Sequence, residues 1–280
     1  MKYLSTFTGV GGFDMGMPPD WECVGMSEID KHANMVLRYR FKDVKNYGDI
    51  EKISYEELPD FDVLIGGSPC QDVSLAGKRA GLSGVRSRLF FSYVAILKVK
   101  KPRYFIFENV KGLLSSNEGK DFAEVTSQFT EAGYDIWWQV LDASDFGIPQ
   151  HRERIFILGT PGGSGFRKVF LKRKNEEKDN GNRAIIRTLT GGAHSGGLHS
   201  NMTGIIVRNK NIRRLTPLEC ERLQGWPDDW TKYGIDEKGN VMEISDNARY
   251  NLIGNGVVPQ VVRELIGSVM IASDSKEALR

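Results

Sequence analysis

The sequence predicts an α/β fold in which helices cover both faces of a mostly parallel, Rossmann-like sheet. Short apolar runs bounded by Gly, Pro or Asp recur along the chain up to Gly159, and stretches with apolar residues three or four apart lie between them. This alternation of strands and helices favours parallel strands buried on both faces. A glycine-rich, basic segment after Gly159 indicates a small additional region outside the sheet.

Each expected element follows from its own local pattern. Apolar runs predict strands, most of them buried, over Lys2–Phe7, Glu22–Met26, Phe61–Ile65, Arg103–Phe107, Trp137–Leu141 and Arg154–Leu158. Helical spacing predicts helices over Lys31–Phe41, Ser87–Lys100 and Asp121–Ala132. Thr216, Pro217 and Glu219 have the pattern of a capping box, which predicts a helix that runs to about Gly225. A last helix is expected after Pro259.

Composition limits the class of protein. The 280 residues are 40% hydrophobic and 26% charged, which suits one large or two modest globular domains and excludes a disordered chain. Cys23, Cys70 and Cys220 form no CxxC pair and the four histidines form no ligand pattern, so we expect neither disulfides nor a metal site. With no leader and no long apolar run in the sequence, we expect a cytoplasmic protein that does not bind membranes.

Charge is concentrated in one part of the chain. The net charge is only +2, yet residues 161–214 hold twelve Lys or Arg, three Asp or Glu and nine glycines, so the rest of the chain carries −7. A basic, glycine-rich insert beside an acidic body is typical of a nucleic-acid contact surface. A solvated loop explains the same charge equally well.

A glycine loop directly after the first strand indicates a nucleoside pocket. The glycines of Phe7–Gly12 allow a tight turn and a close approach of backbone to a ligand. The GxGxxG pattern of dinucleotide sites fails at Asp14, which disfavours NAD. Glu28 stands where an acidic residue commonly binds ribose hydroxyls, and Asp49 is a similar candidate. The alternatives are a surface carboxylate and an ordinary turn residue.

Two strands end in residues that could take part in catalysis. Cys70 stands in a polar loop after a Gly-Gly-Ser-Pro turn, with four Lys or Arg soon after it, a setting that favours a nucleophilic thiolate. Cys23 and Cys220 lie in apolar patterns and are expected in the core. Glu108 directly follows an apolar strand, so partial desolvation would raise its pKa; a strand-end carboxylate in water is the alternative.

The entrance to the last predicted strand presents two arginines together. Strand alternation sends Arg152 and Arg154 to one side and Glu153 to the other. Two guanidinium groups on one side suit an anionic or carbonyl-rich ligand.

Taken in order, these segments resemble the motifs of the DNA (cytosine-5) methyltransferase family, of the prokaryotic or phage restriction-modification type. The matching segments are Phe7–Gly12, Gly67–Gln71, Glu108–Val110, Gln150–Arg154, Arg214–Pro227 and Gly254–Val258. Six motifs in the family's order form a far more specific signal than any one of them. The resemblance implies the class I methyltransferase fold and methyl transfer to C5 of a flipped-out cytosine in a short DNA sequence.

The resemblance also implies S-adenosylmethionine as cofactor and gives each site residue a task. Cys70 would attack C6 of the cytosine, while Glu108 would hydrogen-bond and protonate N3. Arg154 would hold the O2 side of the base, and Arg152 would assist near the nucleophile. The implied cofactor contacts are Phe7, Gly9, Gly11, Glu28, Ile29, Asp49, Ile50, Pro69, Leu89, Asn255 and Val257.

Domains and partners follow from the same resemblance. Residues 1–160 would form the catalytic and cofactor-binding domain, 161–214 the target-recognition region, and 215–280 a segment that returns to complete the catalytic domain. The implied partner is double-stranded DNA; a cognate restriction endonuclease is expected in the same system, and the chain is expected to be a monomer. The implied DNA contacts are Gln71, Ser74, Lys172, Arg173, Lys174, Arg187 and Thr188.

Three other interpretations compete. An RNA (tRNA) cytosine-5 methyltransferase would share the chemistry, but the Cys-Phe-Thr signature of that branch is not in the sequence. A catalytically silent DNA-binding homologue is disfavoured because Cys70, Glu108, Arg152 and Arg154 are all intact. An NAD-dependent dehydrogenase leaves the Pro-Cys-Gln turn and the basic segment unexplained.

Overall fold

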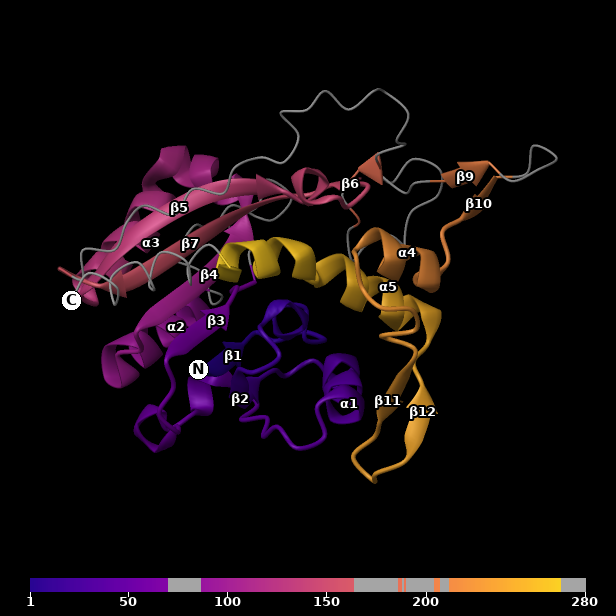
Figure 1. The fold of residues 1–280 in the computed structure, drawn as a ribbon, viewed down its shortest axis with the longest axis horizontal. Helices are drawn as coiled ribbons and strands as arrows, with labels where there is room; N and C mark the ends of the chain where they lie inside the picture. Colours follow the sequence, from indigo (N-terminus) through magenta and orange to yellow (C-terminus); the bar gives the residue numbers. More distant parts are fainter. Residues whose placement is uncertain (70–86, 164–185, 188, 190–203, 207–211, 268–280) are drawn as a thin grey trace.

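A six-stranded sheet forms the centre of the molecule (Figure 1). The computed structural model describes residues 1–69, 87–163, 186–187, 189, 204–206 and 212–267. The strand order is β2-β1-β3-β4-β7-β5, with β1 parallel to β2 and β3, and β3 parallel to β4. Only β7 runs antiparallel, to both β4 and β5, so the predicted mostly parallel sheet is confirmed. Its strands are β1 (Lys2–Thr6), β2 (Glu22–Ser27), β3 (Val63–Gly66), β4 (Tyr104–Val110), β5 (Tyr134–Asp142) and β7 (Glu153–Pro161).

The predicted helices are present. They are α1 (Lys31–Arg40), α2 (Ser87–Lys100), α3 (Lys120–Glu131), α4 (Pro217–Leu223) and a last helix over 259–267. A further helix, α5 (Asp246–Asn255), was not predicted. The capping box of α4 is formed as predicted, because Thr216 Oγ1 accepts from the Glu219 amide and the Glu219 carboxylate accepts from the Thr216 amide at 2.7 Å.

Short elements connect these larger ones. The 3₁₀ helices are η1 (Asp14–Gly16), η2 (Ile50–Lys52), η3 (Tyr55–Glu57), η5 (Lys111–Gly119) and η6 (Ala143–Phe146). The short strands are β6 (Gln150–His151), β8 (Ile186–Arg187), β9 (Gly204–Ile206), β10 (Ile212–Arg214), β11 (Tyr233–Ile235) and β12 (Val241–Glu243). They pair as β6 with β8, β9 with β10, and β11 with β12.

Both faces of the sheet are covered, because successive side chains of a strand point to opposite faces. In β4, Ile106 belongs to a cluster with the last helix, while Phe105 and Phe107 belong to a cluster with α2 and α3. Gly159 of β7 leaves room for the Phe105 ring, since a Cβ at position 159 would lie 1.9 Å from that ring.

Strands β5 and β4 add detail to the sequence prediction. The strand predicted over Trp137–Leu141 is an edge strand, β5, and it is not one of the fully buried ones, because Trp138 is 47% exposed. Strand β4 continues past Phe107, so that Glu108 lies within the strand and pairs with Phe156 of β7. The residues of β7 that pair with β4 lie 44 to 54 positions further along the chain, where a local pattern carries no information.

A third core cluster joins the ends of the chain. It contains residues of α1, α4 and α5 together with Val10 and Leu189. Indole N–H groups hold it together: Trp226 donates to the Val257 carbonyl at 3.0 Å, and Trp230 donates to the Val10 carbonyl at 2.8 Å. The C-terminal segment therefore packs directly against the loop that follows the first strand.

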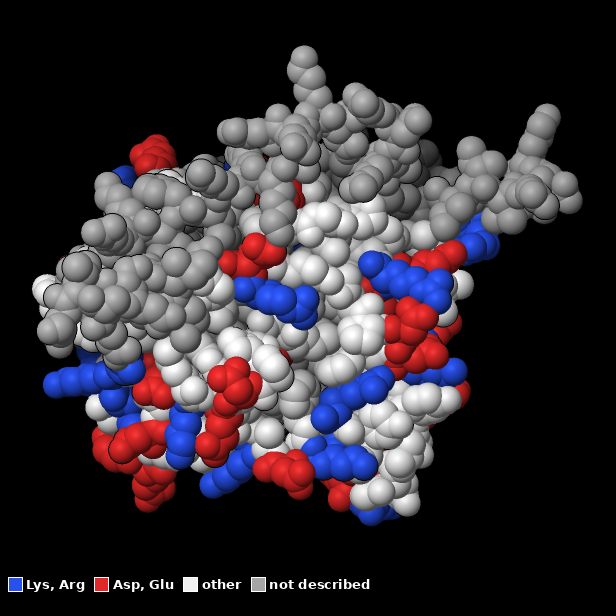
Figure 2. Space-filling view, viewed as in Figure 1, with Lys and Arg blue, Asp and Glu red and all other residues white. Residues whose placement is uncertain are grey.

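Charge on the described surface is mixed. Figure 2 shows acidic and basic side chains interspersed over one face of the body. Among the helices that the structure describes, none is long and apolar enough to cross a membrane.

Candidate active site

A cavity of about 370 Å³ opens where the carboxyl ends of β1, β3 and β4 meet. Its volume lies within the range of about 300–1,000 Å³ that is usual for cofactor and small-molecule sites. The carboxyl edge of a parallel sheet is also where α/β proteins bind their ligands. Loops after β1, β2 and β3, the end of β4 and the C-terminal half of α5 contribute to its walls.

The glycine loop forms one wall and depends on left-handed backbone. Gly9 and Gly11 have φ values of 58° and 85°, which glycine adopts without strain. Phe7 also has a positive φ, of 51°, which is uncommon for an aromatic residue. Gly12 lies directly against the Val257 backbone, because a Cβ there would meet the Val257 oxygen at 2.9 Å.

Glu28 connects this loop to the end of β2. Its carboxylate accepts hydrogen bonds from the Gly9 amide at 2.7 Å and from the Ile29 and Asp30 amides at 2.8 Å. Burial raises the pKa of Glu28, and the three amides oppose that rise. Ile29 beside it is 68% exposed and lines the cavity, so an apolar surface is available to a flat ligand.

Most of the predicted cofactor contacts come together in this cavity. Gly11 and Val257 are outside its lining: Gly11 faces the Phe41 ring, and Val257 is buried in the core. The predicted residues that line it are Phe7, Gly9, Glu28, Ile29, Asp49, Ile50, Pro69, Leu89 and Asn255.

A carboxyl group and a guanidinium group meet at the inner end of the cavity. Arg154 Nε lies 3.1 Å from Glu108 Oε1, and both side chains are 17% exposed. Burial raises the pKa of Glu108, while the charges of Arg154 and Arg152 oppose this rise. Gly67 makes the arrangement possible, because a Cβ there would lie 2.7 Å from a Glu108 carboxylate oxygen.

Arg152 also lines the cavity, but its guanidinium is held by backbone. It donates to the carbonyls of Leu189 at 2.9 Å, Gly254 at 3.1 Å and Gly256 at 2.8 Å, and the residue is only 3% exposed. Glu153 points away from the cavity and pairs with Lys111 at 2.8 Å. The predicted division of these strand residues between two sides is therefore confirmed.

Several predicted residues lie outside the described part of the chain. These are Cys70, Gln71, Ser74, Lys172, Arg173, Lys174 and Thr188. Arg187 is described through its backbone, which pairs with His151 in the β6–β8 ladder. Of the two other cysteines, Cys220 is buried as predicted, and Cys23 is half-buried against the core. Burial raises the pKa of both thiols to about 12.

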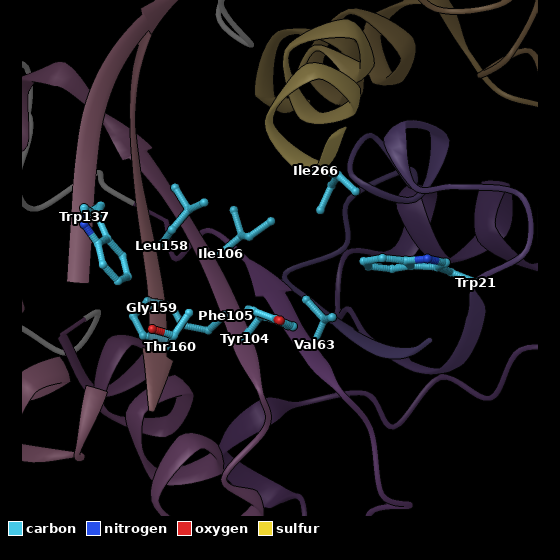
Figure 3. A pocket seen from close by; sticks show the side chains of 10 residues that line it. All are labelled: Trp21, Val63, Tyr104, Phe105, Ile106, Trp137, Leu158, Gly159, Thr160 and Ile266. Atoms are coloured by element: carbon cyan, nitrogen blue, oxygen red, sulfur yellow. The ribbon is translucent and has the colours of Figure 1, made fainter. Parts of the chain in front are cut away.

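A second hollow, of about 10 Å³, lies at the opposite edge of the sheet (Figure 3). Val63 and Tyr104 on its wall are the first residues of their strands, and Ile266 comes from the last helix. All ten lining residues are uncharged, and the volume is at most enough for one water molecule. This hollow is a packing gap, whereas the polar cavity at the carboxyl edge has the chemistry of a site.

Comparison with known proteins establishes the family. The model for C-5 cytosine-specific DNA methylases matches residues 1–201 and 163–270. The chain belongs to this family. It is 32% identical to the type II methyltransferase M.HaeII of Haemophilus aegyptius, over 96% of this chain and 92% of that one. It is 43% identical to the orphan methyltransferase M.Rho11sI of Bacillus phage rho11s over 57% of this chain, and that match spans only 33% of the phage protein.

Solved structures give the same fold. The crystal structure of the S. pombe Dnmt2 methyltransferase superposes with a TM-score of 0.75 at 18% identity, covering 97% of this chain and 98% of that one.

Sequence reasoning missed some residues in the candidate site of this family member. Asn109 is buried and donates from Nδ2 to the Ser68 carbonyl at 3.4 Å, so it supports the turn that leads to Cys70. Asn251 and Leu252 of α5 line the cavity as well. Of these three residues, only Asn109 could have been found from the local sequence, because it stands beside Glu108 at the end of an apolar run.

Proposed function

We propose that the protein transfers a methyl group from S-adenosylmethionine to C5 of a cytosine in DNA. The observation that carries this proposal is the buried Glu108–Arg154 pair beside Gly67, at the inner end of a cofactor-sized cavity. Such a pair presents one proton donor and one fixed cation to the polar edge of a flat base. Family membership supports the same reaction.

The cavity suits S-adenosylmethionine by its donor set. The Glu28 carboxylate and Asp49 offer acceptors for ribose hydroxyls and the adenine amino group, and Ile29, Ile50 and Leu89 offer apolar surface for the ring. Bound S-adenosylmethionine supplies an electrophilic methyl group. The chain's own residues must then make C5 of the base nucleophilic.

We assign that activation to Cys70, Glu108 and Arg154. The Cys70 thiolate adds to C6, and the electron pair of the C5–C6 bond becomes available for C5 to take the methyl group. Glu108, whose pKa is raised by burial, carries a proton to N3, and Arg154 stabilises the charge that develops at O2. Loss of the C5 proton to a base then expels the thiolate and restores the ring.

Recognition of DNA is assigned to residues 161–214. Their charge of +9 suits phosphate contacts, for which Lys172, Arg173, Lys174, Arg187 and Thr188 are the proposed residues. Gln71 and Ser74, next to the nucleophile, are proposed to contact DNA when the target base leaves the stack. Residues 1–160 and 215–280 would together form the catalytic domain.

The test is a methylation map at base resolution. Purified protein and S-adenosylmethionine are incubated with unmethylated genomic DNA, and 5-methylcytosine confined to one short sequence is the expected result. Methylation of tRNA and not of DNA would instead select the RNA methyltransferase interpretation. If a folded protein that binds the cofactor methylates neither DNA nor tRNA, the result would select the interpretation as a catalytically silent DNA-binding homologue.

Replacing the nucleophile is the sharper test of mechanism. Cys70→Ala is expected to abolish methyl transfer while DNA binding persists, because the covalent step needs the sulfur. Cys23→Ala, which removes a half-buried thiol of β2 outside the cavity, serves as the matched control and should keep its activity. Turnover by the Cys70→Ala variant would rule out Cys70 as the nucleophile.

A further inference from the structure

A buried polar layer lies behind the cavity and joins three distant segments. Gln150 and Gln224 are fully buried, and Arg152 nearly so. Gln150 Nε2 donates to Gln224 Oε1 at 2.8 Å and to the Leu223 carbonyl at 3.0 Å. The layer therefore links the β6–β7 segment to the end of α4.

Leu189 enters this layer through both of its backbone groups. Its amide donates to Gln150 Oε1 at 3.0 Å, and its carbonyl accepts from the Arg152 guanidinium at 2.9 Å. Its side chain is buried in the cluster that contains Val10 of the glycine loop. Leu189 belongs to the segment 161–214 that we assign to DNA recognition, so this segment is held at one residue by two side chains of the catalytic domain.

The same layer holds the wall of the cofactor cavity. The Arg152 guanidinium donates to the carbonyls of Gly254 and Gly256, and Gln224 Nε2 donates to the Gly256 carbonyl at 2.8 Å. Gly254, Asn255 and Gly256 line the cavity. One guanidinium group thus bonds to the recognition segment and to the cofactor wall at once.

In such a layer, a shift of one residue displaces the residues that are hydrogen-bonded to it. Buried polar groups are costly to leave unpaired, so Leu189 cannot move away from Gln150 and Arg152 without disturbing the bonds of both. Movement of Arg152 in turn alters its bonds to the cavity wall. Coupling of this kind is reciprocal: whatever DNA does to cofactor affinity, cofactor does to DNA affinity.

We propose that Gln150 and Arg152 are positioning residues that couple DNA binding by residues 161–214 to cofactor binding. DNA bound to the recognition segment fixes the position of Leu189. Because Arg152 is hydrogen-bonded both to Leu189 and to Gly254 and Gly256, the cavity wall is then fixed as well, so that each ligand tightens the binding of the other. The inference rests on the proposed function, since it takes DNA and S-adenosylmethionine as the two ligands.

The test measures the dissociation constant of S-adenosylhomocysteine with and without a duplex that carries the mapped recognition sequence. In the wild-type protein DNA should tighten this binding at least about fivefold, the lower end of usual coupling factors. Gln150→Met keeps the length of the side chain and removes its bonds to Leu189, Gln224 and Leu223. The coupling ratio is the dissociation constant of S-adenosylhomocysteine without DNA divided by that with DNA. In this variant the ratio should fall below about twofold, while the affinity for S-adenosylhomocysteine without DNA stays near the wild-type value.

Gln260→Met is the matched control. It removes a hydrogen bond from Gln260 Nε2 to the Gly225 carbonyl, at 2.8 Å, which joins the last helix to the residues after α4 and does not involve Leu189. This variant should keep the wild-type ratio. Equal loss of coupling in both variants would overturn the proposal, because general loosening would then explain it.

A second variant covers failure of the first to fold. Arg152→Lys keeps the charge but cannot bridge three carbonyls, so the ratio should fall here too. A wild-type ratio near one, or a full ratio in either folded variant, overturns the coupling. A wild-type protein that binds neither ligand overturns the proposed function instead, so the two failures are distinguishable.

Discussion

Asp14 is a carboxyl group placed in the apolar core. It is 8% exposed, and its best partner is Ser5 Oγ, which donates to Oδ2 at 3.1 Å. Burial raises its pKa from 3.8 to about 6, against the lowering effect of that hydrogen bond. The folded protein therefore binds this proton more tightly than the unfolded chain. The resulting stability is fully present below about pH 4 and is lost as the pH rises through about 6.

We expect Asp14→Asn to remove this loss. The gain in unfolding free energy over the wild type should grow by roughly 2 kcal/mol between pH 4 and pH 7, as measured by urea unfolding. Asp60→Asn is the control, because Lys100 lowers the pKa of this exposed carboxyl and its pH trend has the opposite sign. A gain for Asp14→Asn that does not depend on pH would contradict the assignment.

Single residues were predictable where their signal was local. Glu108 was found from its place beside an apolar run, and its raised pKa is confirmed. The position of Asp14 was noted only as a departure from a glycine pattern, because nothing local shows that its side chain turns into the core. Arg152 shows the same limit, since its carbonyl partners at Leu189, Gly254 and Gly256 lie 37 to 104 positions away.

At the scale of elements, α4 depends on its first turn. The helix has only seven residues, and its N-terminus is closed by the Thr216–Glu219 capping box. Arg213 adds two bonds to the Glu219 carboxylate, at 2.7 and 2.8 Å, and these help to lower the pKa of Glu219 to about 2.

Loss of the cap should be measurable. Thr216→Ala is expected to lower the free energy of unfolding by about 1 kcal/mol, because the Glu219 amide loses its acceptor. Thr216→Ser retains the hydroxyl and should stay within a few tenths of a kcal/mol of the wild type in the same denaturant titration. Equal stability of the Ala variant and the wild type would show that the cap contributes nothing.

Helix ends and strand cores were predicted well because capping and alternation act over a few residues. Strand order was not, because the β4-β7-β5 edge of the sheet is made by pairings between separate parts of the chain. The exposure of Trp138 follows from that order: it lies on the edge strand and faces outward beside Phe122.

For the whole molecule, the uneven charge predicts how DNA binding responds to salt. Each phosphate contact contributes about 0.9 to the slope of log affinity against log salt concentration. Replacing Lys172, Arg173 and Lys174 together with Gln should therefore reduce the slope by up to about 2.7. The same change at three exposed lysines of the body, Lys98, Lys120 and Lys238, should leave the slope as it is. If both triple variants respond alike, bulk charge and not the recognition segment governs affinity.

The contact between Trp230 and the Val10 carbonyl bears on how the protein is made. The indole that holds the loop we assign to the cofactor is synthesised 220 residues after that loop. At about 5–20 residues per second, this interval lasts on the order of ten to forty seconds. All six strands of the central sheet are therefore synthesised before the residues that complete the cavity wall. The cavity is complete only when the C-terminal segment has packed onto the loop after β1.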